Sequence, residues 1–183
     1  AANLTPAAIT LNATGTATGT VSVANGTTGA PTVSISAISG DGTLGISIGA
    51  GTATDAAGNS APAVGPSATF SVDNTAPTLS IGAPDVAQTT QGPVNFPLTY
   101  SGADSVNLDT GAVTLNATGT ASGIVSVSNG NSSTPTVTIS TITGNGTLEI
   151  SVAGGAGSDV AGNSDSGAGP SASVAVDNSN PVI

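Results

Sequence analysis

The sequence contains no lysine, arginine, histidine, cysteine, methionine or tryptophan, and it has only two phenylalanines and one tyrosine. Without these side chains the protein cannot form a Ser-His-Asp or Cys-His catalytic site, a Schiff-base lysine, or a metal site with thiolate or imidazole ligands. Among enzymes, only one that uses carboxylates alone, such as a glycosidase, survives this exclusion. Such an enzyme binds sugars on aromatic rings, whereas Phe70, Phe96 and Tyr100 are predicted to lie in the core. We therefore expect no enzyme activity.

The lack of cationic side chains leaves ten acidic groups unbalanced, so the formal net charge is -10. Nucleic-acid binding depends on Lys and Arg side chains that displace counterions from phosphates, and we expect no nucleic-acid partner. A basic patch for anionic membranes is missing for the same reason. The sequence also has no run of about 20 apolar residues, so no membrane insertion is expected.

What the sequence does contain is an internal repeat with a period of 104 residues, which aligns Val72 with Val176. The alignment needs no gap, and more than half of the overlapping positions are identical. The segment LNATGTA, for example, occurs at 11–17 and again at 115–121. This self-similarity predicts a tandem array of one module.

Apolar residues alternate with Thr and Ser within each copy, as at Val125 and Val127. A period of two is typical of half-buried β-strands, and Gly, Asn, Pro and Asp separate the runs. Seven short strands in a module of roughly 100 residues are typical of an immunoglobulin-like sandwich. We therefore predict an all-β chain of tandem immunoglobulin-like antiparallel β-sandwiches. In the complete copy, strands are predicted at 78–83, 93–100, 112–117, 123–128, 135–142, 147–153 and 171–177.

The repeat also predicts the domain boundaries. Residues 1–74 are expected to form an N-terminally incomplete sandwich, residues 75–178 a complete one, and residues 179–183 the start of a next-module strand or a donor segment. Because residue 1 corresponds to residue 105, the first module lacks its two N-terminal strands. Two explanations are open: the missing strands belong to a longer array, or a neighbour fills the open groove by strand addition.

Two pairs of short motifs carry a resemblance to a known family. They are DAAGN at 55–59 with DVAGN at 159–163, and VDNTAPT at 72–78 with VDNSNPV at 176–182. These motifs resemble those of bacterial Ig-like repeats, which are strung along very large surface and extracellular proteins. The resemblance covers the whole chain. It implies a tandem scaffold that is extracellular or at the cell surface, often adhesive and sometimes stiffened by calcium.

Acidic and amide side chains are expected to gather at one end of each module. In an immunoglobulin-like sandwich, the loop after the second strand, the loop before the last strand and the incoming linker lie at that end. Carboxylate and amide oxygens are ligands that calcium prefers, so the sequence predicts a calcium site at the module junction. The alternative is that Asp55 and Asp159 only close a tight turn, in which Gly58 or Gly162 takes a positive φ. The predicted ligands are Asp73, Asn74, Asp104, Asp159 and Asn163, with Asp55 and Asn59 in the equivalent loop of the first copy.

These features together predict a structural module that acts as a spacer or fibre element of a bacterial surface protein and associates with neighbouring copies of itself. One alternative is a filament subunit assembled by donor-strand complementation. Another is an adhesin module that binds a glycan or a protein through its loops, the longest of which spans 154–169. A covalent glycan is also an option in a secreted setting, although Asn-rich and Thr-rich sequences generate sequons by chance. Sequons occur at Asn3, Asn12, Asn25, Asn116, Asn131 and Asn145.

Overall fold

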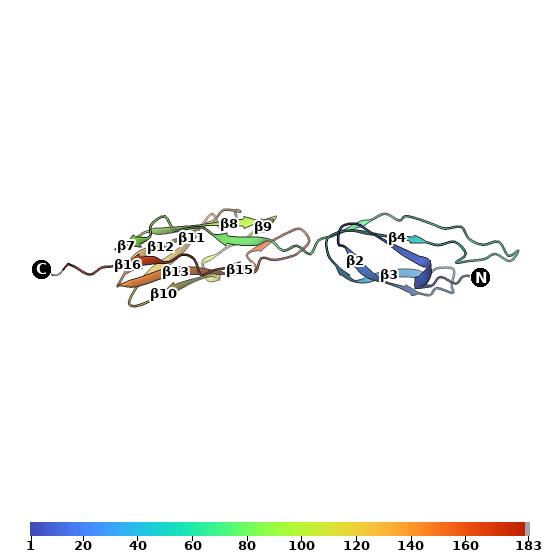
Figure 1. Ribbon diagram of the computed structural model, residues 1–183, viewed down its shortest axis with the longest axis horizontal. Helices are drawn as coiled ribbons and strands as arrows, with labels where there is room; N and C mark the ends of the chain where they lie inside the picture. The colour runs from blue at the N-terminus through green and yellow to red at the C-terminus, as the bar shows by residue number, and fades with distance from the viewer. Residues whose placement is uncertain (182–183) are drawn as a thin grey trace. The chain divides into compact units, whose positions relative to one another are not determined.

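The computed structural model describes residues 1–181, and it divides into two compact units, Ala1–Thr75 (unit 1) and Ala76–Ile183 (unit 2). Both units consist of β-strands joined by loops, with one short 3-10 helix in each (Figure 1). The prediction of an all-β chain is confirmed at this level. In the described part of the chain, no helix is long and apolar enough to cross a membrane.

Unit 2 contains two larger sheets, in which all neighbouring strands are antiparallel except β16 and β7. The first has the strand order β11-β12-β8-β6, and the second has the order β10-β13-β16-β7 with β15 paired to β13. A small sheet joins β9 and β14. The elements are β6 (Thr78–Ile81), β7 (Gln88–Thr89), β8 (Val94–Ser101), β9 (Ser105–Val106), η2 (Thr110–Ala112), β10 (Val113–Ala117), β11 (Ser122–Ser128), β12 (Thr136–Thr143), β13 (Gly146–Ala153), β14 (Gly157–Ser158), β15 (Gly167–Ala168) and β16 (Val174–Val176).

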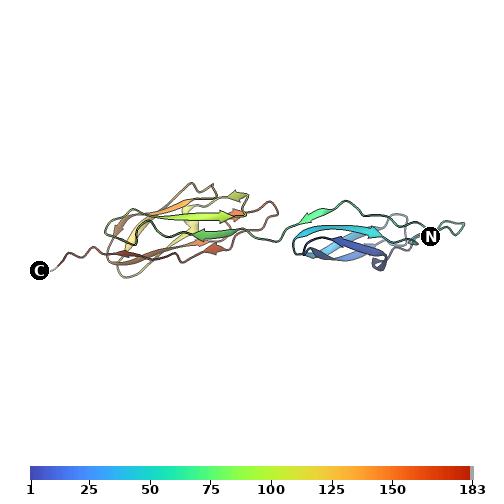
Figure 2. The ribbon, with the colours of Figure 1, turned by 45° about the horizontal axis from the view of Figure 1, so that its top comes forward.

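The core of unit 2 lies between these two sheets. Alternate residues of β8 are buried, because the strand presents one face to the opposite sheet and the other to solvent. Phe96 is fully buried, as are Ile139 on the neighbouring strand and Ile150 across the core. All three belong to one hydrophobic cluster that draws residues from both sheets. Figure 2 shows the two layers from a second direction.

Each of the seven strands predicted for the complete copy corresponds to an observed strand, with bounds that differ by a few residues. The largest difference is at 171–177, where only Val174–Val176 is a strand. The sequence pattern missed the two-residue strands β7, β9, β14 and β15, because a strand that short shows no alternation. The predicted segment 179–183 forms no strand over its described residues, and residues 182–183 lie outside the described part of the chain.

Unit 1 repeats part of this architecture with the same register. Leu11 faces Ile46 across β1 and β4, as Leu115 faces Ile150 across β10 and β13. Its sheets have the orders β1-β4-β5 and β2-β3, so the described chain contains no counterparts of β6, β7 and β8 in this unit. The elements are η1 (Pro6–Ala8), β1 (Ile9–Ala13), β2 (Thr18–Ala24), β3 (Thr32–Ser39), β4 (Gly42–Ile48) and β5 (Phe70–Val72).

The core of unit 1 is correspondingly small, with only Ala17, Leu44 and Val72 in its buried cluster. Phe70 is 44% exposed, so the prediction that it lies in the core was wrong. Its counterpart Val174 is 0% exposed, because in unit 2 that position lies beneath a sheet that contains β8. The other two aromatic residues, Phe96 and Tyr100, are buried as predicted.

Candidate functional site

The motif DVAGN in unit 2 forms a turn that is closed by the Asp159 side chain. Its carboxylate accepts hydrogen bonds from the Asn163 backbone N–H and from Asn163 Nδ2, both at 2.8 Å. Gly162 has a φ of 94°, which favours glycine, and its N–H donates to the Asp159 carbonyl at 3.3 Å. The Asn163 side chain and the backbone N–H groups of the turn hold the pKa of Asp159 below its usual value.

The motif DAAGN in unit 1 forms the same turn. Asp55 Oδ1 accepts from the Ala57 and Asn59 N–H groups at 2.9 Å, and Oδ2 accepts from Asn59 Nδ2 at 2.8 Å. Gly58 has a φ of 91°. The Asn59 side chain is the main cause of a lowered pKa at Asp55, followed by the backbone N–H groups. The repeated motif therefore encodes one local structure, an aspartate-closed turn.

Asp104 lies against the loop that contains Asp159, as the sequence predicted. Its backbone N–H donates to the Ser158 carbonyl at 2.9 Å, and its Oδ2 accepts from the Val160 N–H at 3.0 Å. These two bonds join the loop after β8 to the loop before β16. The structure therefore brings together the part of the predicted ligand set that belongs to unit 2.

The predicted ligands Asp73 and Asn74 belong to unit 1, where Asn74 is bonded to the turn between β3 and β4. The Asn74 N–H donates to Asp41 Oδ1, and its Nδ2 donates to the Gly40 carbonyl, both at 2.7 Å. Asp73 accepts from the Thr75 N–H through Oδ1 at 3.0 Å. The VDN motif thus ties the end of the last strand to a neighbouring hairpin.

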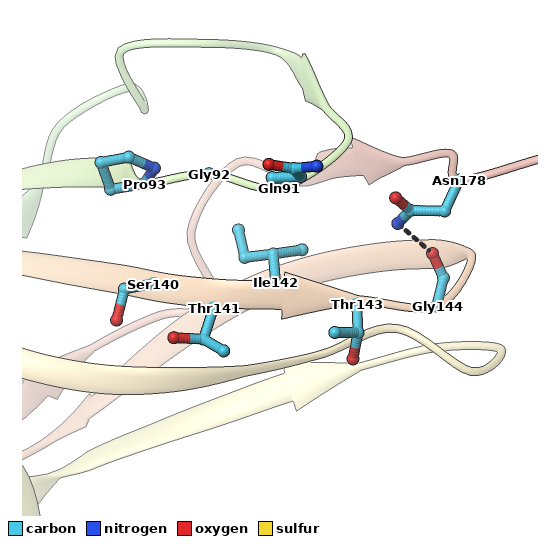
Figure 3. Close-up of a pocket in the computed structure, with 9 residues that line it drawn as sticks. All are labelled: Gln91, Gly92, Pro93, Ser140, Thr141, Ile142, Thr143, Gly144 and Asn178. Carbon is cyan, nitrogen blue, oxygen red and sulfur yellow. Dashed lines mark hydrogen bonds between the residues drawn. The ribbon is translucent and has the colours of Figure 1, made fainter.

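Unit 2 repeats this tie beside a surface pocket. Asn178 Nδ2 donates to the Gly144 carbonyl at 2.7 Å, and the contact is drawn in Figure 3. Gln91, Gly92 and Pro93 cover the other side of the pocket, where Ile142 points toward them (Figure 3). The pocket is lined by Gln91, Gly92, Pro93, Ser140, Thr141, Ile142, Thr143, Gly144 and Asn178.

The predicted calcium ligands have the right chemistry, since carboxylate and amide oxygens suit a hard cation. However, over residues 1–181 no three acidic side chains form a group that could hold a metal ion. Both carboxylate oxygens of Asp159 also accept hydrogen bonds from Asn163. These contacts describe the turn-closing role directly, while calcium binding stays a prediction.

Sequence reasoning did not single out Asp165, which is the one buried acidic residue of the described chain, with 4% exposure. Its Oδ2 accepts from the N–H groups of Gly155 at 3.1 Å and Gly157 at 2.6 Å, and its Oδ1 accepts from Gly167 at 2.8 Å. The carboxylate therefore fixes the loop 154–169 from inside. The spacing Asp-x-Gly, typical of an aspartate-stabilised turn, was the available signal.

Tyr100 lies close to Asp165 in unit 2. Burial, with a smaller contribution from the negative charge of Asp165, raises the pKa of Tyr100 to about 12. The tyrosine is 4% exposed, and its hydroxyl has no hydrogen-bond partner among the described residues. Its ring packs against Gly157, where an added Cβ would lie 2.6 Å from the Tyr100 Cδ1 atom.

Unit 1 presents a second candidate site, which we call the open face. It consists of six large apolar residues of unit 1 that are exposed or half-exposed although their counterparts in unit 2 are buried in the core: Val33, Ile35, Ile38, Ile46, Ile48 and Phe70. The difference is large at Ile38, which is 39% exposed, whereas its counterpart Ile142 is 3% exposed. A hollow lined in part by Ile46, Ile48 and Val64 belongs to the same unit, and Val64 is 64% exposed.

Comparisons with models of protein families, with curated proteins and with solved structures gave no match to this chain.

Proposed function

We propose that this protein is a spacer or fibre element of a bacterial surface protein that resists pulling forces, built from tandem immunoglobulin-like β-sandwich repeats outside the cell. The proposal is supported by the 104-residue repeat and by the identical registers of its two copies. The resemblance of the DxAGN and VDN motifs to bacterial Ig-like repeats supports the location.

The observation that carries the proposal is the pairing of β7 with β16 in unit 2. These strands lie near the two ends of the unit and run parallel, with Ala175 opposite Gln88 and Val176 opposite Thr89. Two further backbone bonds extend the pair, from the Ala175 N–H to Ala87 at 2.9 Å and from the Asp177 N–H to Thr89 at 3.2 Å. We call this pair the terminal clamp.

Parallel strands at the two ends of a unit resist pulling in a specific way. When the ends of the chain are drawn apart, β7 and β16 are pulled in opposite directions along their own axes. The force is then shared among all hydrogen bonds of the clamp, which must break together, whereas bonds loaded across a hairpin end break one after another. Such a geometry slows forced unfolding, which is governed by the unfolding rate rather than by the equilibrium free energy.

Unit 1 provides the internal comparison. Its strand β5 corresponds to β16 but lies at the edge of its sheet, since the described chain supplies no counterpart of β7 there. We therefore expect unit 1 to unfold at lower force than unit 2.

The test is single-molecule stretching of the whole 183-residue chain held at its two ends. We expect an early event at low force from unit 1, followed by a high-force event from unit 2. The second event should release roughly 300 Å of chain, the extended length of the residues between β7 and β16 at about 3.3–3.6 Å each.

A matched pair of variants assigns the high-force event. Ala175→Pro removes the N–H that donates to Ala87, and the exposed side chain leaves room for the ring. Ser71→Pro makes the same change at the equivalent position of unit 1. We expect Ala175→Pro to lower the second force and Ser71→Pro to leave it unchanged. The proposal fails if both units unfold at equal force, or if the two variants act alike.

A second function is favoured by a specific observation. The free edge of β3 and the open face of unit 1 fit a subunit whose sheet is completed by strands from a neighbour, as in a filament assembled by strand complementation.

A further inference from the structure

Unit 2 shows which strands could cover the open face of unit 1, because it contains the equivalent positions together with the strands that bury them. In unit 2, β8 pairs antiparallel with β12, with Phe96 opposite Val137 and Val94 opposite Ile139. β6 pairs with β8 on its other side and lies against β15. Together β6 and β8 bury the residues whose counterparts form the open face.

The backbone of β12 shows which groups a docked strand would use. The Leu98 N–H donates to the Pro135 carbonyl at 2.9 Å, and the Tyr100 N–H donates to the Ser133 carbonyl at 2.8 Å. In the other direction, the Ile142 N–H donates to the Gln91 carbonyl at 3.1 Å.

Unit 1 presents the same edge without its partner, because β3 pairs only with β2 among the described residues. The repeat places the equivalent carbonyls at Pro31 and Gly29 and the equivalent N–H at Ile38. The register is fixed as well, since a strand like β8 would set its Phe opposite Val33 and its Val opposite Ile35. A slip of one residue would turn its apolar side chains to solvent.

One position shows that this occupant is not identical to β8. The Tyr100 ring occupies space beside Gly157, where a Cβ atom would lie 2.6 Å from Cδ1 and 3.0 Å from Cε1. Unit 1 has Ala53 at the equivalent position, in an equivalent bridge: Ala2 pairs with Ala53 as Val106 pairs with Gly157. The alanine methyl group therefore fills the space that a tyrosine ring would need, and buried rings have little freedom to move aside.

We propose that the open face of unit 1 binds an antiparallel strand pair equivalent to β6 and β8, supplied by a segment of a repeat of the same kind. The second strand adds to the free edge of β3, and it carries a side chain smaller than tyrosine at the position of Tyr100. This inference rests on the proposed function for the source of the strands, and it adds the partner, the register and a selection rule. Burial of apolar side chains at the open face drives the binding, while the β3 hydrogen bonds fix its direction.

The test uses the whole 183-residue chain and two synthetic peptides that span residues 77–104. One peptide has the native sequence, and the other carries Tyr100→Val. Binding is measured by calorimetry, and the amides of β3 are followed by NMR. We expect the Tyr100→Val peptide to bind one per chain, to protect the Ile38 amide from exchange, and to bind at least tenfold more tightly than the native peptide.

The variant Ala53→Gly is the matched control for the selection rule. It removes the methyl group from unit 1 and recreates the surroundings that Gly157 gives Tyr100. We expect the Ala53→Gly chain to bind the native peptide and the Tyr100→Val peptide with about the same affinity. If the two peptides bind unmodified chain equally, the selection rule is wrong.

A fused chain keeps the test decisive if a free peptide aggregates. Residues 77–104 with Tyr100→Val are joined directly before Ala1, which restores the spacing that unit 2 has. We expect the melting temperature of unit 1 to rise, with a smaller rise for the fusion that keeps tyrosine. The proposal is overturned if neither peptide binds and neither fusion stabilises unit 1, or if the open faces of two chains pair with each other and exclude the peptides. The stretching experiment measures the forced unfolding of the chain without added strands, whereas this one measures strand binding to unit 1, so failure of either proposal can be recognised separately.

Discussion

Units 1 and 2 share sequence and register but differ in burial. Val33 and Val137 are the same residue at equivalent positions of β3 and β12, yet Val137 is fully buried and Val33 is half-exposed. The difference arises from β6 and β8, which complete one sheet in unit 2 and have no counterpart in the described part of unit 1. An alternating pattern therefore specifies a strand with one apolar face, but a second layer is needed to bury that face. Since a fully buried Val or Ile contributes about 1.5–3 kcal/mol, unit 1 is expected to be the less stable unit.

Two of the sequence differences between the copies lie close to Tyr100. Gly157, which contacts the ring, is replaced by Ala53, and Asp165, whose charge acts on the phenol, is replaced by Ala61. The backbone around both positions is nevertheless retained: the Gly51 N–H donates to Ala61 as the Gly155 N–H donates to Asp165. The two units therefore share backbone hydrogen bonds here but differ in the side chains at these two positions.

The largest change in stability that should affect one unit and not the other is expected at alkaline pH. The pKa of Tyr100 is raised to about 12 in the folded chain, compared with about 10 when unfolded. The folded state then holds a proton that the unfolded state loses, so stability is complete below about pH 10 and falls as the pH rises toward 12. This difference in pKa corresponds to a loss of about 3 kcal/mol in the free energy of unfolding of unit 2.

This loss can be measured cleanly because the chain has no lysine, arginine or cysteine, and a single tyrosine. Urea unfolding curves at rising pH should shift for unit 2 only, and tyrosinate absorbance should show a higher midpoint in the folded chain than in urea. Tyr100→Phe should abolish the shift. An alkaline loss that persists in Tyr100→Phe would contradict this assignment.

A slightly smaller loss of stability is expected from Asp165→Ala, which gives unit 2 the residue that unit 1 has at the equivalent position, Ala61. The substitution removes a buried acceptor from the N–H groups of Gly155, Gly157 and Gly167. A hydrogen bond to a charged group contributes about 1.5–3 kcal/mol to stability. Because the Gly155 N–H keeps its bond to the backbone carbonyl of residue 165, we expect the free energy of unfolding of unit 2 to fall by about 2 kcal/mol.

Tyrosine absorbance during thermal melting reports this loss, since Tyr100 lies in unit 2. The same variant should lower the pKa of Tyr100 slightly, because it removes the nearby negative charge. Ala61→Asp in unit 1 is the reverse control. Equal melting temperatures for Asp165→Ala and the unmodified chain would show that the hydrogen bonds to the Asp165 carboxylate do not stabilise unit 2 beyond its backbone hydrogen bonds.

The same contrast explains what the sequence could predict. Strands such as β8, β12 and β13 were predictable because their apolar residues alternate over seven or eight positions. The DxAGN turns were also predictable, since Asp, Gly and Asn each have a defined role in a tight turn. The exposure of Phe70 was not, because burial depends on strands far away in the sequence.

The inward position of Asp165 was harder to find. The segment 154–169 is rich in glycine and serine and contains two aspartates, each followed by a glycine within three residues. This pattern indicates a turn at each aspartate but does not show that Asp165 is buried whereas Asp159 is only half-buried. The parallel pairing of β7 with β16 was missed for a related reason. A two-residue strand has no periodicity, and its partner lies more than 80 residues away along the chain.

The smallest expected effect is that of calcium removal, and it too should differ between the units. In unit 2 the predicted ligands Asp104 and Asp159 lie on loops joined by two hydrogen bonds, whereas the described residues include the Asp55 turn of unit 1 but no counterpart of Asp104. A site occupied at tenfold its Kd would add about 1.4 kcal/mol. If calcium binds, EDTA should lower the melting temperature of unit 2 by a few degrees and change that of unit 1 less.

Asn163→Ala, with Asn59→Ala as its match in unit 1, should weaken the turn whether or not calcium is present, because Asn163 donates to both oxygens of Asp159. An unchanged melt in EDTA, together with destabilisation by both asparagine variants, would leave turn closure as the role of the repeated motif.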